Sequence, residues 1–169
     1  MNIFLTSDTF FGRQLTALDR GFMSVEEMDD TIIENWNKRV GKKDTVIHLG
    51  NFGWDPISSE SAMIHLNGEI KFMSAVYDSH LPEMSLLRSG RHQLMLNSIT
   101  TFSKDKLIVS HWPLADWYGK EEGIIHAHGG KIKSNTNDGY RFNVNIENWN
   151  FCPIELEFLK EVIELDHDV

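Results

Sequence analysis

The chain has 169 residues, of which 41% are apolar and 24% charged, a globular composition that excludes a disordered or fibrous protein. Sixteen basic against 25 acidic residues give a formal net charge of −9, which argues against a nucleic-acid partner held through its phosphates. No run approaches the roughly 18 apolar residues of a membrane span, so we expect no membrane association. We expect a single domain over residues 1–169.

The first predicted elements are a buried strand over Ile3–Thr6 and a helix over residues 24–40. Ser24 can cap this helix, and Glu27 completes a capping box. Apolar residues recur in it every three or four positions and form one stripe: Val25, Met28, Ile32, Trp36 and Val40. This helix is therefore expected to pack one face on the core.

The rest of the chain continues to alternate between the two kinds of element. A polar stretch over residues 131–139 predicts a loop. Strand–helix alternation predicts an α/β fold whose site is built by loops at strand ends. We expect strands over residues 45–49, 70–76, 107–110, 124–128 and 140–146, and helices over residues 58–66 and 155–165.

Polar residues of ligand type fall where these strands end. Eight histidines and an excess of carboxylates are also the groups that metal-dependent hydrolases use. Cys152 is the only cysteine, and the first residues lack the basic region of a signal peptide, so we expect a cytoplasmic protein. The strand-end groups are Ser7-Asp8, Gly50-Asn51, Tyr77-Asp78, Ser110-His111 and His126-Ala127-His128.

The sequence resembles the calcineurin-like metallophosphoesterases, specifically the small single-domain type of bacteria and phages. The resemblance implies an α/β/β/α sandwich of two facing sheets flanked by helices. Enzymes of this family hold two metal ions bridged by an aspartate, and the ions activate water and clamp a phosphoryl group. The matching blocks cover nearly the whole chain, and among them are Phe4-Leu5-Thr6-Ser7-Asp8-Thr9, Asp44-Thr45-Val46-Ile47-His48-Leu49-Gly50, Leu66-Asn67-Gly68 and Ser110-His111-Trp112-Pro113-Leu114.

Several family motifs are incomplete in this chain. The Asp-x-His motif keeps Asp8 but has phenylalanine in place of histidine, and the Gly-Asp motif has asparagine in place of the bridging aspartate. Phenylalanine and valine cannot ligate a metal, and a neutral asparagine replaces a bridging carboxylate poorly. The positions that depart from the motifs are Phe10, Asn51, Val76, Tyr77 and Gly130.

The resemblance assigns Asp8, His111 and His128 to the metal positions, as the remnant of an incomplete ligand set. A shifted register over residues 125–128 would place His126 at a ligand position as well. We expect no catalytic residue and no bound cofactor. The alternative is a single Zn or Mn ion at the three surviving residues, giving a residual mononuclear phosphoesterase.

We therefore expect a catalytically inactive homologue, a pseudoenzyme, that binds a protein partner. If the chain is phage-encoded, it would act in the host cytoplasm as a regulator of a host protein. A further alternative is a sensor that binds a nucleotide or phosphate, although Asp8 and Asp78 would repel it in the absence of a cation.

The expected binding residues are Phe10, Phe11, Asn51, Val76 and Tyr77. They form either a hydrophobic recognition surface or a collapsed filling of the former metal pocket, and the sequence leaves both open. Neighbouring loops carry aromatic residues that would widen such a surface: Phe52, Trp54, Trp112 and Trp117. His48 is expected to be a hydrogen-bonded strand residue, whereas His65, His80, His92 and His167 are expected to be solvated.

Overall fold

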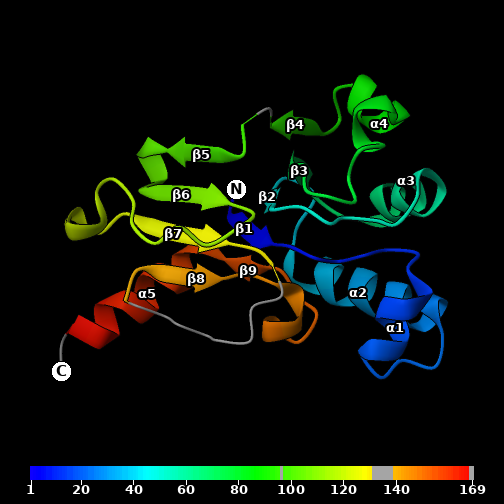
Figure 1. The fold of residues 1–169 in the computed structure, drawn as a ribbon, viewed down its shortest axis with the longest axis horizontal. Helices are drawn as coiled ribbons and strands as arrows, with labels where there is room; N and C mark the ends of the chain where they lie inside the picture. The colour runs from blue at the N-terminus through cyan, green and yellow to red at the C-terminus, as the bar shows by residue number, and fades with distance from the viewer. Residues whose placement is uncertain (96, 131–138, 168–169) are drawn as a thin grey trace.

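The computed structural model describes residues 1–95, 97–130 and 139–167, and within them two sheets face each other and are flanked by helices (Figure 1). In the five-stranded sheet only β9 is antiparallel to its neighbour, and in the four-stranded sheet only β5 is. The first sheet has the order β4 (Gln93–Met95), β3 (Glu69–Met73), β2 (Thr45–His48), β1 (Ile3–Thr6) and β9 (Ile154–Glu155). The second has the order β5 (Ile99–Phe102), β6 (Leu107–Ser110), β7 (Ile125–His128) and β8 (Arg141–Asn143).

The helices lie around these two sheets. Figure 1 shows α1, α2 and α3 together on one side of the five-stranded sheet, with the four-stranded sheet on the other. No helix among the described residues is long and apolar enough to cross a membrane. The helices are α1 (Gln14–Asp19), α2 (Val25–Arg39), α3 (Pro56–His65), α4 (Ser85–Arg88) and α5 (Leu156–His167).

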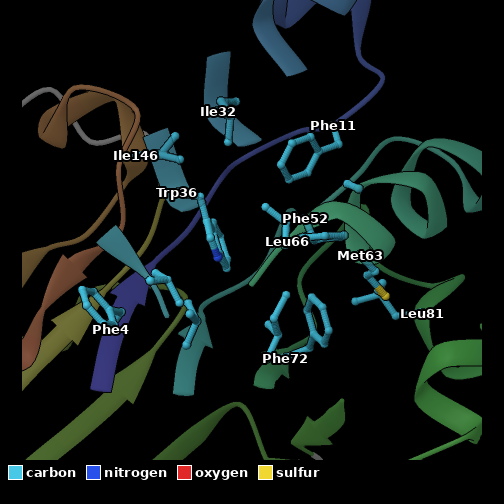
Figure 2. Packing of buried hydrophobic residues seen from close by; sticks show 14 of the residues in the cluster. Phe4, Phe11, Ile32, Trp36, Phe52, Met63, Leu66, Phe72, Leu81 and Ile146 are labelled. Atoms are coloured by element: carbon cyan, nitrogen blue, oxygen red, sulfur yellow. The ribbon is translucent and has the colours of Figure 1, made fainter. Parts of the chain in front are cut away.

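Two hydrophobic clusters form the core. The first joins the apolar stripe of α2 and one side of α3 to the outer face of the five-stranded sheet. In it, Trp36 is fully buried (Figure 2). Its Nε1 donates to the carbonyl of Asn67 at 3.0 Å. The second cluster joins the inner faces of both sheets and α5, and its members include Leu5, Ile47, Val109 and Phe142. Successive side chains of a strand point to opposite faces of its sheet, so the five-stranded sheet contributes to both hydrophobic clusters.

Local sequence sets the helix starts as expected. Ser24 caps α2, since its Oγ accepts from the amide of Glu27 at 3.2 Å. The carboxylate of Glu27 reaches back to the amide of Met23 at 2.7 Å, one residue earlier than in a standard capping box. Asp55 caps α3 through the amides of Ile57 and Ser58, and Pro56 occupies the first helical position.

Some boundaries differ from the sequence-based predictions. Strand β3 ends at Met73 rather than at residue 76, so Val76 and Tyr77 lie in the following loop. Strand β8 ends at Asn143, after which Ile146–Trp149 form a 3₁₀ turn capped by Asn145. The patterns missed α1 and the short strands β4, β5 and β9, which are too brief for a clear periodicity. The loop predicted over residues 131–139 falls almost entirely outside the described residues.

The parallel strands bring their carboxyl ends to one edge of the sandwich. Thr6 of β1 is level with His48 of β2, and Ser110 of β6 is level with His128 of β7. A bridge between Ser7 and Asn145 connects the two sheets just beyond these ends. Side chains that follow β1, β2, β6 and β7 therefore converge in space, although they are far apart in the sequence.

Candidate functional site

The carboxylate of Asp8 lies at the centre of this edge and is almost fully buried. Its Oδ2 accepts hydrogen bonds from Ser7 Oγ at 2.7 Å and from the amide of Gly130 at 2.9 Å. Its Oδ1 accepts from the side-chain amide of Asn51 at 2.8 Å. Three donors from three different strand ends therefore surround one buried carboxylate.

The side-chain amide of Asn51 lies between Asp8 and His111. Its Nδ2 is 2.8 Å from Asp8 Oδ1 and 3.4 Å from His111 Nε2. His111 Nδ1 lies 2.6 Å from the carbonyl of Leu49, which only accepts, so Nδ1 carries the proton and Nε2 presents a lone pair. Because Asp8 Oδ1 only accepts, the NH₂ group must face it, and the buried amide oxygen is left without a hydrogen-bond partner.

Gly130 stands at a position where the resemblance expects a histidine ligand. It contributes a backbone N–H to Asp8 instead, and it adopts a left-handed conformation with φ +80°. A Cβ at this position would meet the ring of Trp112 at 3.2 Å. The backbone at this point therefore favours glycine and approaches the aromatic ring closely.

His128 lies at the end of β7, beside this network. Its Nδ1 is 2.9 Å from the carbonyl of Gly129, so this nitrogen donates and Nε2 is unprotonated. Burial lowers the pKa of His128, with a smaller contribution from Arg141, while the charge of Asp8 acts in the opposite direction. Its ring stacks on His126 at 5.5 Å, and Nε2 of His126 is bonded to Ser110 Oγ at 2.9 Å.

Asp78, which the resemblance keeps from the third motif, joins two loops rather than facing a ligand. Its carboxylate accepts from the amides of Asn51, Phe52 and Ala75 at 2.6, 2.9 and 2.8 Å. Burial raises the pKa of Asp78, and these three hydrogen bonds oppose the shift. The group therefore fixes the loop after β2 against the loop after β3.

The backbone at this edge is strained at three residues. Asp8, Phe10 and Asn51 have φ values of 59°, 54° and 58°, in the left-handed region. Such a conformation costs about 1–3 kcal/mol for a residue other than glycine, with asparagine the most tolerant. Strain of this kind concentrates at functional sites, and here it falls on the first two motifs that the family resemblance identified.

His48 is a structural residue, as the sequence indicated. It is fully buried, and its Nε2 is bonded to Thr9 Oγ1 at 3.0 Å. Burial lowers its pKa to about 3, so the ring is neutral. The prediction of a solvated His92 is wrong, because this side chain is buried and its Nδ1 accepts from the amide of Ile70 at 3.1 Å.

An aromatic patch, which we define as Phe10, Trp54, Val76 and Tyr77, borders the polar network. The amide of Phe10 donates to the carbonyl of Asn51 at 3.0 Å, which connects the patch to the network. The ring of Tyr77 lies 5.6 Å from that of Phe10 and 5.4 Å from that of Trp54. Val76 is 74% exposed, Trp54 47% and Tyr77 37%, so the patch faces solvent.

The guanidinium of Arg13 lies over all three rings of the patch. Its distances to the ring centroids of Phe10, Trp54 and Tyr77 are 5.1, 4.8 and 5.0 Å. This geometry is that of a cation–π interaction. The sequence gives no signal for Arg13, because a single arginine forms no pattern and only the fold brings the three rings around it.

Other aromatic residues expected near this surface divide into two groups. Phe11 is fully buried, and its ring lies 5.2 Å from that of Phe52 in a tilted arrangement, so Phe11 fills the interior rather than the surface, the second of the two alternatives. Phe52 and Trp117 are buried as well, whereas Trp112 is 59% exposed and lies edge-on to His111. The side chain of Arg20, also missed, is buried and donates to the carbonyls of Asp8 and Thr9 and to Glu147.

The residues at the strand ends do not fit a dinuclear metal centre. Both oxygens of Asp8 are engaged by hydrogen-bond donors, and the amide nitrogen of Asn51, rather than an oxygen, faces Asp8 and His111. Phe10 cannot ligate a metal. In the described part of the chain, no three histidine, cysteine, aspartate or glutamate side chains are grouped so as to hold a metal ion.

The fold and these strand-end groups define an α/β sandwich protein with a buried polar site at one edge. Over 176 aligned residues the chain is 30% identical to an uncharacterized protein of Methanocaldococcus jannaschii, covering 96% of this chain and 91% of that protein. The chain belongs to the family of this archaeal protein. No protein-family model matches the sequence.

Other comparisons are weaker. A protein of unknown function from Aquifex aeolicus has the same fold, with a TM-score of 0.72 and 17% identity over 95% of this chain and 98% of that one. An archaeal phosphodiesterase has a TM-score of only 0.45, with 14% identity over 86% of this chain and 82% of that one. A glucose-6-phosphate isomerase of Wigglesworthia glossinidia brevipalpis is 27% identical over 136 residues, 72% of this chain, which spans 24% of that enzyme.

Proposed function

We propose that this chain is a non-catalytic binding protein on a metallophosphoesterase-like scaffold, and that a protein partner contacts the aromatic patch. The observation that carries the proposal is the exposure of Trp54, Val76 and Tyr77 beside a polar site whose groups bond to one another. We propose further that the chain acts without a cofactor.

The composition of the patch supports a protein partner. Tryptophan, tyrosine and arginine are the residues most enriched among those that dominate protein–protein binding energy. The cation–π contacts hold Arg13 and the rings in one arrangement before binding, which lowers the ordering cost of association. A collapsed filling of a former pocket would bury these side chains, and three of the four patch residues are instead at least 37% exposed.

The polar network supports the absence of hydrolysis. In the metallophosphoesterases that the sequence resembles, two metal ions share one bridging aspartate. Here the Asn51 amide, the Gly130 amide and the Ser7 hydroxyl supply the positive ends of dipoles to Asp8. These donors satisfy the buried carboxylate internally, which removes the need for a metal to balance its charge.

Site-specific photo-crosslinking tests the partner. We would replace Val76 with benzoylphenylalanine and, as the matched control, Tyr118, an aromatic residue that is 82% exposed outside the patch. The proposal expects an adduct of one defined mass from position 76 that disappears when Trp54→Ala and Tyr77→Ala are added. It fails if position 76 gives no adduct, or if position 118 gives the same one.

A second candidate function is a residual phosphoesterase with one Zn or Mn ion at Asp8, His111 and His128, which would have to move together, because they are not grouped as a metal site in the described structure. The observation that favours it is the tautomer of both histidines, since each donates through Nδ1 and leaves Nε2 unprotonated, as a metal ligand requires. Its test is hydrolysis of bis(p-nitrophenyl) phosphate with added Mn²⁺ or Zn²⁺. This candidate requires activity that His128→Ala abolishes.

A further inference from the structure

A groove of about 700 Å³ runs between α2 and α3, and Phe11 and Gly12 of the segment that precedes α1 also line it. Figure 1 shows this segment passing from β1 towards α1 between the two helices. The groove lies next to the aromatic patch in sequence, since Gly12 precedes Arg13 and Asp55 follows Trp54. It is nevertheless a separate surface, and a ligand bound in it would not need the patch.

The lining of this groove combines apolar and acidic side chains. Val25, Ile33 and Ile57 supply apolar surface, and Ile57 is 84% exposed on the first turn of α3. None of the described residues that line it is lysine or arginine. The acidic side chains are Glu26, Asp29, Asp30 and Asp55.

The carboxylate of Asp29 is only partly satisfied by hydrogen bonds, and its charged neighbours in the groove are acidic. Its Oδ2 accepts from the amide of Gly12 at 2.9 Å, whereas its Oδ1 is buried and has no hydrogen-bond partner. Burial raises the pKa of Asp29 to about 7, with Asp30 and Glu26 adding to the shift and Arg20 opposing it. A cation bound in the groove would offset this repulsion.

We propose that this groove binds a basic amphipathic helix of a protein partner, with its apolar face on Val25, Ile33 and Ile57 and its lysines or arginines on the acidic rim. Charge complementarity selects this occupant, because the lining holds four carboxylates and one histidine and no lysine or arginine. A second copy of the chain carries a net charge of −9 and is repelled. A free polyamine would satisfy the carboxylates and leave Ile57 uncovered.

The test uses a fluorescein-labelled leucine–lysine peptide of roughly four helical turns, with leucines on one face, and its leucine–glutamate counterpart. Fluorescence anisotropy gives the Kd for the wild-type chain and for Glu26→Lys/Asp30→Lys, which reverses two exposed charges. The matched control is Glu121→Lys/Glu161→Lys, with the same charge change at exposed positions outside the groove. Ile57→Ser tests the apolar contact without changing the charge.

We expect the lysine peptide to bind the wild type and the control equally, and the glutamate peptide to bind neither. Glu26→Lys/Asp30→Lys should weaken binding at least about tenfold, Ile57→Ser about fivefold, and added salt should weaken it further. Circular dichroism checks that the variants keep the helix content of the wild type. The proposal is overturned if both double variants bind the lysine peptide alike, or if spermidine binds the groove as tightly as the peptide does and displaces it. It is also overturned if sedimentation shows a dimer that Glu26→Lys/Asp30→Lys abolishes.

Discussion

The polar network and the aromatic patch lie side by side, yet the polar side chains are buried and the apolar ones are exposed, the reverse of the usual distribution. In the network, Asp8, Asn51 and His111 are buried at 2%, 7% and 6% exposure, whereas in the patch Val76 and Trp54 are 74% and 47% exposed. The polar groups bond to Asp8, whereas Val76, Trp54 and Tyr77 each keep at least 37% of their surface exposed. The comparison indicates that the pocket holds the structure together and that the patch is available for binding.

The two regions differ in the side chains that stand at the positions where the metallophosphoesterase resemblance expects ligands. In the network, Asn51 and Gly130 donate hydrogen bonds to the carboxylate of Asp8. In the patch, the rings of Phe10 and Tyr77 lie around Arg13 instead. Removal of a network group should therefore cost stability, and removal of a patch residue should cost binding.

The largest effect is expected for Asp8→Ala. This change leaves the Asn51 amide, the Gly130 amide and the Ser7 hydroxyl buried without their acceptor, so we expect a loss of about 4 kcal/mol in the free energy of unfolding. Urea denaturation measures it, with Asp19→Ala, an exposed aspartate on α1, as the control. A variant as stable as the wild type, or more so, would mean that Asp8 is an unpaired ligand rather than the centre of a network.

Asn51→Asp should be the next most damaging change. It introduces the carboxylate that the metallophosphoesterase resemblance expects, but it places a second buried charge against Asp8, which we expect to cost about 3 kcal/mol at neutral pH. The loss should shrink in acid, where the pair takes up a proton, and on adding Mn²⁺. If Asn51→Asp unfolds at the wild-type urea concentration without metal, the amide is not essential to the network.

Trp54→Ala tests the patch and should cost only about 1.5 kcal/mol, since the side chain is half exposed and contributes one ring contact and one cation–π contact. Urea denaturation measures the loss, and the crosslink from position 76 should disappear in the same variant. A loss as large as that of Asp8→Ala would place Trp54 in the core rather than at an interface.

The smallest effect concerns pH and Asp29. Its pKa in the folded chain, about 7, lies above the ordinary value, so the folded state binds more protons and stability falls as pH rises through this range. Asp29→Asn removes that loss, and its free energy of unfolding relative to wild type should rise by about 1 kcal/mol from about pH 4 to above pH 7, after allowance for solvent screening. A pH-independent difference would show that Asp29 titrates normally.

The sequence predicted the fold well and the site in part. Strand–helix alternation and the apolar stripe on α2 predicted an α/β fold, because burial imposes such periodicity. The two-sheet sandwich was implied by the family resemblance of the blocks around β1, β2 and β6. The polar groups at the strand ends were found for the same reason, since parallel strands end at one edge. The short strands β4 and β9 were missed because their pairing depends on distant residues.

The roles of individual residues were less predictable. Phe11 looked like its neighbour Phe10, and only the structure shows that one packs on Phe52 in the core and the other on Arg13 and Tyr77. Whether Asn51 turns its oxygen or its nitrogen towards Asp8 depends on His111, which lies 60 residues further along the chain. Such details follow from tertiary contacts, and a sequence pattern does not contain them.

Calorimetric titration of the dialysed chain with Mn²⁺ and with Zn²⁺ tests whether hydrogen bonds satisfy Asp8 and leave the pocket without a metal. The comparison is with His128→Ala, which removes a ligand-type side chain beside the network without removing a bond to Asp8. We expect the same isotherm for both proteins. Stoichiometric binding in the wild type that is absent from His128→Ala would contradict it.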